Sequence, residues 1–502
     1  MTDSIISSIP EIFRMTNILF MFLGVGAGII FGCLPGLSAT MGVALMLPLT
    51  FGLDPITGIL FLLGVYVGGI YGGSISAILI NTPGTPASAA TTIDGYYLTK
   101  KGKAGDALRM ALYASVIAGV ISALVLLFLA PQIAKVALKF GPPEYFALAL
   151  FGLAMISSVS GKSILKGLIM GVIGFSIATI GLDPIGGSAR LSFGNENLFG
   201  GIQLIPALIG LFAIAEIINR SQTAHSEETQ TAKFKDSKFP FSIVMKNLKT
   251  IVKSSFIGTA IGAIPGTGAT IASYMSYNEA MRSSKKKDEF GKGSIEGVAA
   301  AEAGNNGVTG STLIPLLTLG IPGDTVTAVM LGALMMQGLT PGPQLFTTHA
   351  DFVYAIMVGL IVVNLIMLIN GKLAIKLFVR VTAIPFNVLV PILLTLSFIG
   401  AYAVNNTLFD VKVMLVFGLL GFVMGKFGFP STPLLLGLVL GPIAETSLRQ
   451  ALILSKGSWT IFFTQPISLA FIVIAVISFL IPFIKMFRDT LKERKDKSIS
   501  HN

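Results

Sequence analysis

The sequence has few of the residues on which soluble proteins and metal or redox enzymes depend. Only 12% of its 502 residues are charged, against roughly 25% in an average soluble domain, and it holds one tryptophan, one cysteine and three histidines. The single cysteine, Cys33, excludes an internal disulfide, and none of the histidines falls in an apolar segment where it would bind a metal. A soluble fold and zinc, haem or redox chemistry are therefore disfavoured.

Motifs of intramembrane enzymes and ATP-driven pumps are also missing. The chain has no H-E-x-x-H helix, no G-x-S-G segment and no G-x-x-x-x-G-K-[ST] phosphate loop. The segment 321–324 reads IPGD, with isoleucine where the G-x-G-D aspartyl proteases have their first glycine. We therefore expect neither an enzyme nor a cofactor. The N-terminus also lacks a basic stretch followed by a cleavage site, so we expect its first apolar segment to be retained.

Long apolar runs dominate the chain. Hydrophobic residues make up 53% of it, and the mean hydropathy is +0.82. This composition predicts an all-α polytopic membrane protein with about 11 crossings. Of its 35 Lys and Arg residues, 22 fall in the segments 95–109, 219–256, 282–292 and 485–502, which are therefore predicted to be cytoplasmic. The net charge of +11 thus indicates loops beside membrane lipid and no nucleic-acid partner.

Two sequence signatures occur twice in the same order. GCLPGLSAT at 32–40 recurs as GAIPGTGAT at 262–270, and NTPGT at 81–85 corresponds to GIPGDT at 320–325. We therefore predict a first membrane repeat at 1–218 and a second at 251–450. Between them, 219–250 forms a basic cytoplasmic linker with an interfacial amphipathic helix. A further transmembrane helix at 451–484 and a basic cytoplasmic tail at 485–502 complete the chain.

The charge of equivalent loops predicts that the two repeats are inverted. Residues 51–55 carry no Lys or Arg, whereas the equivalent 282–292 carries five, and the bias reverses after the second signature. Residues 17–52 and 251–281 would then be re-entrant hairpins, with the N-terminus on the periplasmic side. The alternative for 17–52 is an ordinary transmembrane helix with a proline kink.

The four Pro-Gly breaks point to a binding site, because irregular backbone at membrane depth requires protein or water around it. The predicted structural breaks are Pro35, Gly36, Pro265, Gly266, Pro322 and Gly323. Helix N-termini bind anions and freed carbonyls bind sodium. The substrate-binding candidates are Ser38, Thr40, Asn81, Thr82, Pro83, Gly84, Thr85, Thr267, Gly268, Thr270, Asn305, Asn306 and Thr325. The candidates for coupling to a cation, sodium or a proton, are Asp324, Asn305 and Thr318.

Alternatives stay open for individual residues. Asp324 is a candidate sodium ligand or protonatable group, since a carboxylate in an apolar segment is costly, but a plain helix N-cap explains it too. Glu302 either lines a polar cavity or pairs with a basic loop residue. Gly64, Gly68 and Gly72, at four-residue spacing, are assigned to close helix packing.

At these motifs the sequence resembles the large membrane subunit of the tripartite tricarboxylate transporters, the TctA-like family. The matching stretches are 32–55, 72–109 and 262–343. The resemblance implies a secondary carrier of the bacterial inner membrane that works with a small membrane subunit and a periplasmic solute-binding protein. The substrate would be an organic carboxylate such as citrate, imported with sodium or protons. A carrier without a binding protein is the alternative. The inverted repeat further suggests an elevator-like exchange between two conformations.

Overall fold

The chain is built almost entirely of helices. The computed structural model describes residues 2–155, 164–223, 239–381, 384 and 386–480. Within them, two short antiparallel strands, β1 (Gly181–Leu182) and β2 (Ala189–Arg190), form a sheet. Seven helical segments are long and apolar enough to cross a membrane: Met15–Cys33, Pro55–Ile80, Ala104–Ala137, Leu204–Gln222, Ala350–Leu373, Leu408–Lys426 and Ser431–Leu454. This confirms the predicted all-α polytopic class. The count of 11 crossings and the inverted repeat remain predictions.

The chain divides into two compact units. Unit 1 holds residues 1–138 and 205–422, and unit 2 holds residues 139–204 and 423–502. Each predicted repeat therefore contributes to both units, and the repeat boundaries themselves stay a prediction. The predicted tail at 485–502 and the middle of the predicted linker, residues 224–238, lie outside the described residues.

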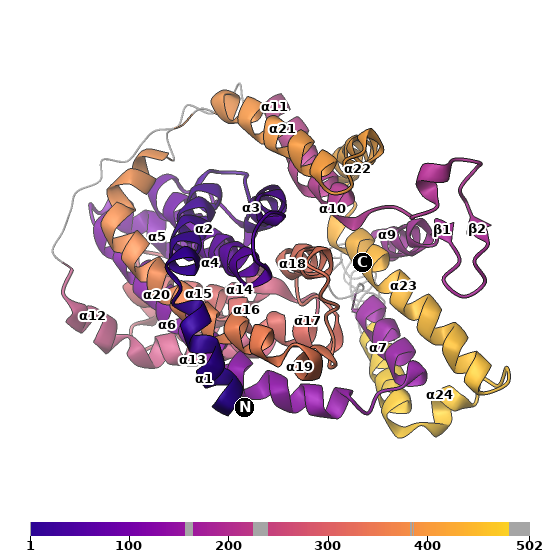
Figure 1. Cartoon of the computed structure of the whole chain (residues 1–502). Helices are drawn as coiled ribbons and strands as arrows, with labels where there is room; N and C mark the ends of the chain where they lie inside the picture. The colour runs from indigo at the N-terminus through magenta and orange to yellow at the C-terminus, as the bar shows by residue number, and fades with distance from the viewer. Residues whose placement is uncertain (1, 156–163, 224–238, 382–383, 385, 481–502) are drawn as a thin grey trace, which may run out of the picture. The chain divides into compact units, whose positions relative to one another are not determined.

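Unit 1 contains the four Pro-Gly breaks (Figure 1). Its first part consists of α1 (Thr2–Ile12), α2 (Met15–Cys33), α3 (Ala39–Met46), η1 (Leu47–Thr50), α4 (Pro55–Ile80), η2 (Pro86–Ser88), α5 (Ala89–Lys100) and α6 (Ala104–Ala137). Its second part begins with α10 (Leu204–Leu208), the π-helical turn η4 (Ile209–Ile214), α11 (Ala215–Thr223), α12 (Phe241–Lys246), α13 (Leu248–Gly262), α14 (Gly268–Ser283) and η5 (Lys287–Glu289). It continues with α15 (Ile295–Asn306), α16 (Val308–Ser311), α17 (Leu313–Leu319), α18 (Thr325–Met336), α19 (Leu345–Thr348), α20 (Ala350–Val381), α21 (Phe386–Ala403) and most of α22 (Leu408–Lys426).

Helices α2 and α4 pack backbone against backbone. A Cβ at Gly68 would stand 2.4 Å from the carbonyl oxygen of Val25, and one at Gly28 would stand 2.3 Å from that of Val65. Gly64 and Gly72 meet the α2 backbone in the same way. The assignment of these glycines to helix packing is confirmed, since only residues without a side chain permit this separation.

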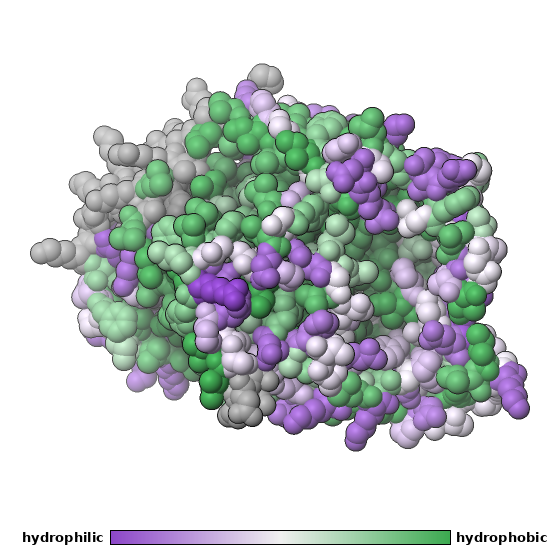
Figure 2. Space-filling view, in the orientation of Figure 1, coloured by the Kyte–Doolittle hydropathy of each residue, from purple (hydrophilic) through white to green (hydrophobic). Residues whose placement is uncertain are grey.

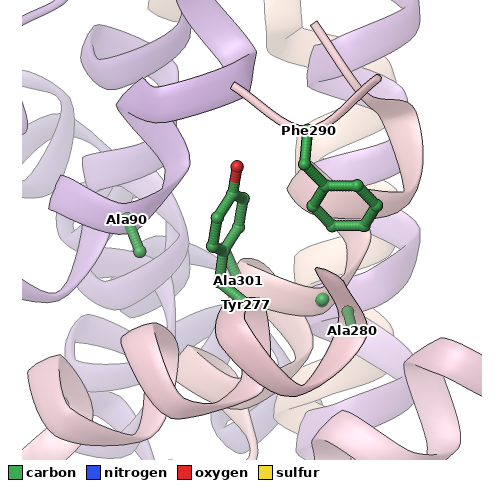
Figure 3. Close-up of a cluster of buried hydrophobic side chains, with 6 residues drawn as sticks. Ala90, Tyr277, Ala280, Phe290 and Ala301 are labelled. Atoms are coloured by element: carbon green, nitrogen blue, oxygen red, sulfur yellow. The ribbon is translucent and has the colours of Figure 1, made fainter. Parts of the chain in front are cut away.

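A second core lies where α5, α14 and α15 meet (Figure 3). The rings of Tyr277 and Phe290 pack edge to face at 5.5 Å against Ala90 and Ala301. The Tyr277 hydroxyl donates to Asp94 Oδ2 at 2.8 Å, and Asp94 Oδ1 accepts from the backbone N–H groups of Gly293 and Ser294. Asp94 therefore fixes the loop that leads into α15.

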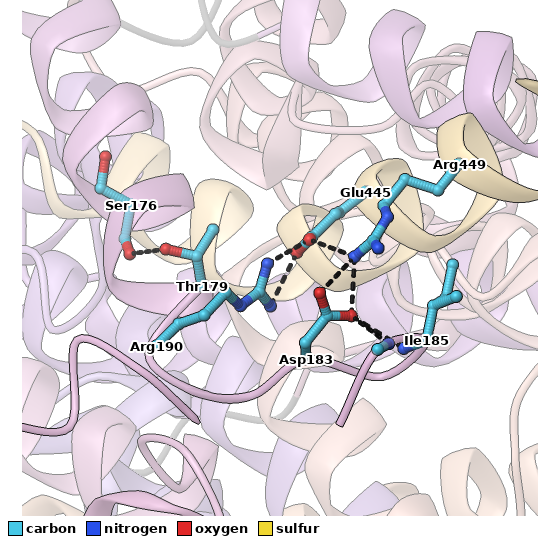
Figure 4. A network of polar contacts seen from close by, with 8 residues as sticks. Ser176, Thr179, Asp183, Ile185, Arg190, Glu445 and Arg449 are labelled. Carbon is cyan, nitrogen blue, oxygen red and sulfur yellow. Dashed lines mark hydrogen bonds and ion pairs between the residues drawn. The ribbon is translucent and has the colours of Figure 1, made fainter. Parts of the chain in front are cut away.

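Unit 2 comprises α7 (Pro142–Ala154), α9 (Ile164–Ala178), β1, β2, η3 (Glu196–Leu198), α23 (Ser431–Leu454), α24 (Ile461–Thr464) and an apolar helix over Pro466–Leu480. Arg449 donates to both carboxylate oxygens of Asp183 at 2.7 Å, and Arg190 pairs with Glu445 (Figure 4). These ion pairs attach the β1–β2 hairpin to α23. The guanidinium of Arg449 lowers the pKa of Asp183 well below its ordinary value, helped by the N–H groups of Gly186 and Ile185.

Apolar side chains cover much of the outer surface of the helices. Phe128 on α6 and Leu419 on α22 are about three-fifths exposed, and Leu373 on α20 is more exposed still. Green, apolar residues likewise spread across the visible face in Figure 2. Such a surface is typical of helices that face lipid, because water would make this exposure costly.

Candidate functional site

The second break of each predicted repeat has the same local construction. Helices α4 and α17 are followed by the C-cap residues Asn81 and Gly320, both in the left-handed conformation, with φ of 57° and 70°. A Pro-Gly pair follows, and a new helix starts after Thr85 and after Asp324. These corresponding residues lie 239 positions apart, which is the offset of the sequence signature. At both breaks, therefore, five residues separate the end of one helix from the start of the next.

The capping of the two new helices differs in one respect. Asp324 Oδ1 accepts from the N–H of Thr327 at 2.8 Å, and Thr327 Oγ1 accepts from the N–H of Asp324 at 2.8 Å. At the other break, Ser88 Oγ accepts from the N–H of Thr85 at 3.3 Å, but the Thr85 hydroxyl does not complete the reciprocal pair. Asp324 is thus an N-cap, as the alternative interpretation anticipated. The Thr85 oxygen is left without a partner in the described part of the chain.

The first breaks also end and restart helices. Gly36 and Gly266 have φ of 82° and 80°, a conformation that glycine adopts without steric cost. In the first repeat, Ser38 Oγ accepts from the N–H of Met41 and caps α3. In the second, the Thr267 hydroxyl donates backwards to the carbonyl of Ile264 at 2.9 Å. The Thr267 hydroxyl therefore donates to a carbonyl that follows α13, and its side chain does not cap the N-terminus of α14.

The four breaks come together inside unit 1. Thr40 Oγ1 on α3 lies 2.8 Å from Thr325 Oγ1 on α18, which joins the first break of one repeat to the second break of the other. The second break of the first repeat and the first break of the second repeat also meet, because Ala87 in η2 packs with Ala269 on α14. Within the second repeat, the Gly266 N–H donates to the Gly323 carbonyl at 2.7 Å. Four segments far apart in sequence thus form one cluster.

The first repeat has its own contact between breaks. The Gly84 N–H donates to the Gly73 carbonyl at 3.2 Å, and a Cβ at Gly84 would lie 1.9 Å from the Gly32 carbonyl oxygen. No side chain fits at this point. The glycine of the predicted Asn81–Thr85 segment is therefore required by the close approach of two backbones.

Tyr66 and Thr312 contact the cluster, although the sequence analysis did not select them. The Tyr66 hydroxyl donates to Asp324 Oδ2 at 2.9 Å and lies 3.1 Å from Thr312 Oγ1. Tyr66 is buried on α4, 258 positions before Asp324. A polar hydroxyl among the glycines of an apolar helix was the available signal, but sequence alone does not say what it faces.

Several predicted residues are buried with unused hydrogen-bonding groups. Neither side-chain atom of Asn305 has a partner among the described residues, and the same holds for Thr85 Oγ1. The hydroxyl of Tyr71, a residue that the sequence analysis did not select, is also without a partner there. Buried polar groups are normally hydrogen-bonded, so this group of donors and acceptors is suited to a polar ligand. Asn305 is the most notable of them, because it offers two donors and one acceptor.

Other predicted residues are satisfied locally. The hydroxyl of Thr318 donates to the Ile314 carbonyl of its own helix at 2.7 Å, and that of Thr82 donates to Ile80 at 3.4 Å. Asn306 is satisfied only in part, since its Nδ2 donates to Ser115 Oγ of α6 at 2.8 Å but its Oδ1 has no partner among the described residues. The Asn81 side chain is exposed, and Pro83, Gly268 and Thr270 are half-buried beside the breaks.

Glu302 does not pair with a basic loop residue, which is one of the two alternatives that the sequence left open, and the other alternative, a polar cavity, stays a prediction. Glu302 is fully buried and accepts hydrogen bonds from the hydroxyls of Thr91 and Ser115, and no lysine or arginine of the described residues pairs with it. Over the same residues, no group of three or more His, Cys, Asp or Glu side chains could hold a metal ion. A sodium ion at Asp324 would therefore need hydroxyl, amide or backbone oxygens as its other ligands.

Broken helices clustered inside a bundle of apolar helices define this chain as a multi-pass helical membrane protein. The chain belongs to the tripartite tricarboxylate transporter TctA family, whose model matches residues 18–436. The resemblance is thus confirmed, and the family gives the chain a role in transport as a subunit of a tricarboxylate transporter.

Two proteins of Agrobacterium vitis are similar to this chain. One, described as an uncharacterized 52.8 kDa protein in the TAR-I ttuC′ 3′ region, is 39% identical over 483 residues, which cover 96% of each chain. The other, described as an uncharacterized protein in the TAR-II ttuC′ 3′ region, is 41% identical over 235 residues, covering 46% of this chain and 97% of the relative. No solved structure matches this chain.

Proposed function

We propose that this chain is the permease subunit of a binding-protein-dependent system that imports tricarboxylates or related organic carboxylates by cation symport. Its partners would be a periplasmic solute-binding protein and a small membrane subunit in the bacterial inner membrane. The family membership supports this proposal. The observation that carries it is the contact of Thr40 with Thr325, because it brings the N-termini of α3 and α18 together at one place.

A carboxylate would bind where these helices begin. The first N–H groups of a helix have no acceptor within it, and the helix dipole adds positive potential there. Ser38 and Asp324 occupy the N–H groups of Met41 and Thr327, so the neighbouring N–H groups of these first turns would bind the carboxylate. Ser38, Thr40 and Thr325 add hydroxyls at these ends. Asn305, on α15 beside α4 and η2, is a separate candidate whose amide has no partner among the described residues. This set recognises carboxylate groups without a lysine or arginine, which suits a site from which the substrate has to be released.

Asp324 is proposed to couple this binding to sodium or a proton. One of its oxygens is held by Thr327 and the other by Tyr66, so the carboxylate is fixed in place at the start of α18. A cation beside it would offset the charge of the incoming carboxylate. Asn305 is the further candidate ligand, whereas Thr318 contributes only if its hydroxyl leaves the Ile314 carbonyl.

Transport would follow an elevator-like exchange, with the C-terminus in the cytoplasm and the N-terminus in the periplasm. All four breaks lie in unit 1, which supports a moving unit that carries the whole site. In a Cys33→Ser background, cysteines at Ser38 and Thr267 should change accessibility to membrane-impermeant reagents as substrate and cation are added. Accessibility fixed to one side in every condition would contradict the exchange.

The test of function is uptake of labelled citrate into proteoliposomes that contain this chain, with and without the two partners, under an imposed sodium or proton gradient. Uptake that needs a gradient and the binding protein supports the tripartite symporter. Uptake without partners would favour the alternative, a solitary carboxylate symporter. Absence of uptake for citrate and a panel of other di- and tricarboxylates under either gradient would contradict both.

A further inference from the structure

Glu302 is a buried carboxylate that the site described above does not use. It lies on α15 with no exposed surface, and its side chain reaches two neighbouring helices. The Thr91 hydroxyl of α5 bonds to Oε1, and the Ser115 hydroxyl of α6 bonds to Oε2 at 3.2 Å. An ionised carboxylate away from water is costly unless a cation or several donors compensate it. Here two neutral hydroxyls are its partners.

Hydroxyl partners allow Glu302 to exist with or without a proton. A hydroxyl donates to a carboxylate and equally accepts from a carboxylic acid, so Thr91 and Ser115 fit both forms at the same heavy-atom positions. Asp324 differs at one of its two oxygens, because the Thr327 N–H can only donate to Oδ1, which leaves Oδ2, beside the Tyr66 hydroxyl, as the one position for a proton. Both oxygens of Glu302 face hydroxyls, so either of them can carry a proton without loss of a hydrogen bond.

Asn306 extends the cluster one turn along α15. Its Nδ2 donates to Ser115 Oγ at 2.8 Å and to the backbone carbonyl of Glu302 at 3.3 Å, while its Oδ1 has no partner in the described part of the chain. On α4, the Tyr71 hydroxyl lies within electrostatic range of Glu302 and is likewise unpartnered among the described residues. Glu302 thus belongs to a buried polar cluster that retains unused hydrogen-bonding capacity.

The other titratable groups on the helices around α15 have partners elsewhere. On α5, Asp94 is held by Tyr277 of α14 and by two backbone N–H groups. Lys253 of α13 pairs with Glu279 of α14, which Arg282 also contacts. The remaining charged groups lie toward the helix ends and are half-buried or exposed: Lys100 on α5, Asp106, Arg109 and Lys135 on α6, Lys249 on α13, and Glu296 on α15 itself. Segments η2 and α16 contribute no titratable side chain.

We propose that Glu302 is a proton-binding site of this chain, and that the proton it binds on one side of the membrane and releases on the other is cotransported with the carboxylate. The inference rests on the proposed symport function and adds a proton to any cation bound at Asp324. In the proton-loaded form the acid is neutral and remains buried between α5, α6 and α15. Release of the proton requires these helices to admit water or a cation to the carboxylate.

The first experiment measures the charge state of Glu302 directly in the purified full-length protein. Infrared difference spectra between acidic and alkaline pH should contain the carbonyl band of a buried carboxylic acid in the wild type. That band should be missing from Glu302→Gln and kept in Glu296→Gln. Glu296 is a matched control, because it lies on the same helix and also accepts two hydroxyl bonds, from Thr250 and Ser284. An unchanged band in Glu302→Gln overturns the proposal.

The second experiment separates coupling from transport in proteoliposomes with the partner subunits. A gradient of one pH unit drives about tenfold accumulation for each cotransported proton. Wild type and Glu296→Gln should show this accumulation together with proton entry reported by an internal pH dye. Glu302→Gln should exchange internal for external substrate at the wild-type rate but accumulate none with the pH gradient.

The outcomes separate this inference from the proposed function. Sodium-driven accumulation by the wild type without proton entry, or proton-driven accumulation by Glu302→Gln, overturns the role of Glu302 and leaves the symporter intact. No accumulation by the wild type under either gradient contradicts the proposed symport function, and it contradicts the coupling role of Glu302 as well, since that role depends on symport. If Glu302→Gln neither binds its partners nor exchanges substrate, the test uses Glu302→Asp, which retains a carboxyl group and should keep proton-driven accumulation. Loss of proton coupling in a Glu302→Asp protein that still exchanges substrate would overturn the proposal.

Discussion

The side-chain oxygens of Thr40 and Thr325 lie 2.8 Å apart although 285 positions separate the two residues. Each stands in the first turn of a helix that follows a Pro-Gly break. The contact therefore records a meeting of two helix N-termini, which is the geometry that favours a bound anion.

Removing either hydroxyl should weaken the binding of substrate. A hydrogen bond contributes about 0.5–1.5 kcal/mol net, so Thr40→Val and Thr325→Val should each raise the apparent KM for the carboxylate about two- to tenfold. The measurement is initial uptake rate against substrate concentration. Thr395→Val is the control, since that hydroxyl bonds only to the Pro391 carbonyl of its own helix. Equal KM values for all four proteins would contradict the assigned site.

The carboxylate of Asp324 should be required for coupling more than for folding. Asparagine remains a good N-cap, so Asp324→Asn should express normally and lose cation-driven accumulation. Tyr66→Phe removes one donor to Asp324 Oδ2 and should weaken the dependence of uptake on the cation without abolishing it. Expression, uptake and cation titration measure these effects. Uptake by Asp324→Asn at the wild-type rate would rule out the coupling role.

A methyl group at Gly68 should separate α2 from α4. Its Cβ would stand 2.4 Å from the Val25 carbonyl oxygen, which is backbone and has no alternative position. Overpacking of this kind costs about 1–3 kcal/mol, so Gly68→Ala should lower the thermal midpoint of the purified protein. Gly26→Ala is a matched control on the same pair of helices, because nothing lies within 4 Å of its added Cβ. A similar midpoint for both variants would show that the close packing is dispensable.

Acid should weaken the attachment of the β1–β2 hairpin to α23. The folded-state pKa of Asp183 is lowered by Arg449, so the pair stabilises the fold fully above the unfolded carboxyl pKa of about 4. This stability is lost as the pH falls through the lower folded-state pKa. Thermal midpoints measured from neutral pH down to about pH 2 should fall more steeply for wild type than for Asp183→Asn. Parallel pH profiles would contradict this contribution.

Local features of the site could be predicted from sequence because they have local causes. Proline and glycine end helices by removing a donor and by permitting positive φ, and the glycines of α4 sit at the spacing of one helix face. The structure accordingly ends α2 at Cys33, shortly before Pro35, and ends α17 at Leu319, shortly before Pro322. Within the predicted linker 219–250, the structure has a short helix, α12, which ends before Asn247, and α13 begins directly after that residue.

Partners across the fold could not be predicted, because they depend on how distant helices pack. Tyr66 reaches Asp324 over 258 positions, and Thr91 reaches Glu302 over 211. The two alternatives for Glu302, a polar cavity or a basic partner, omitted neutral hydroxyls. Threonine and serine are common on membrane helices, so their sequence positions alone do not single out the two that contact a buried carboxylate.

The joined backbones of α2 and α4 have a mechanical consequence. Helix α2 leads into the break at Pro35 and α4 into the break at Pro83. Glycines of both helices contact the backbone of the other helix along their length: Gly24, Gly28 and Gly32 on α2, and Gly64, Gly68 and Gly72 on α4. Two helices in such close contact along their length are expected to move together as one rigid body. In the proposed exchange, we therefore expect Ser38 and Thr85 to move relative to each other only through the few residues that follow each helix end, which would be the hinges of the first predicted repeat.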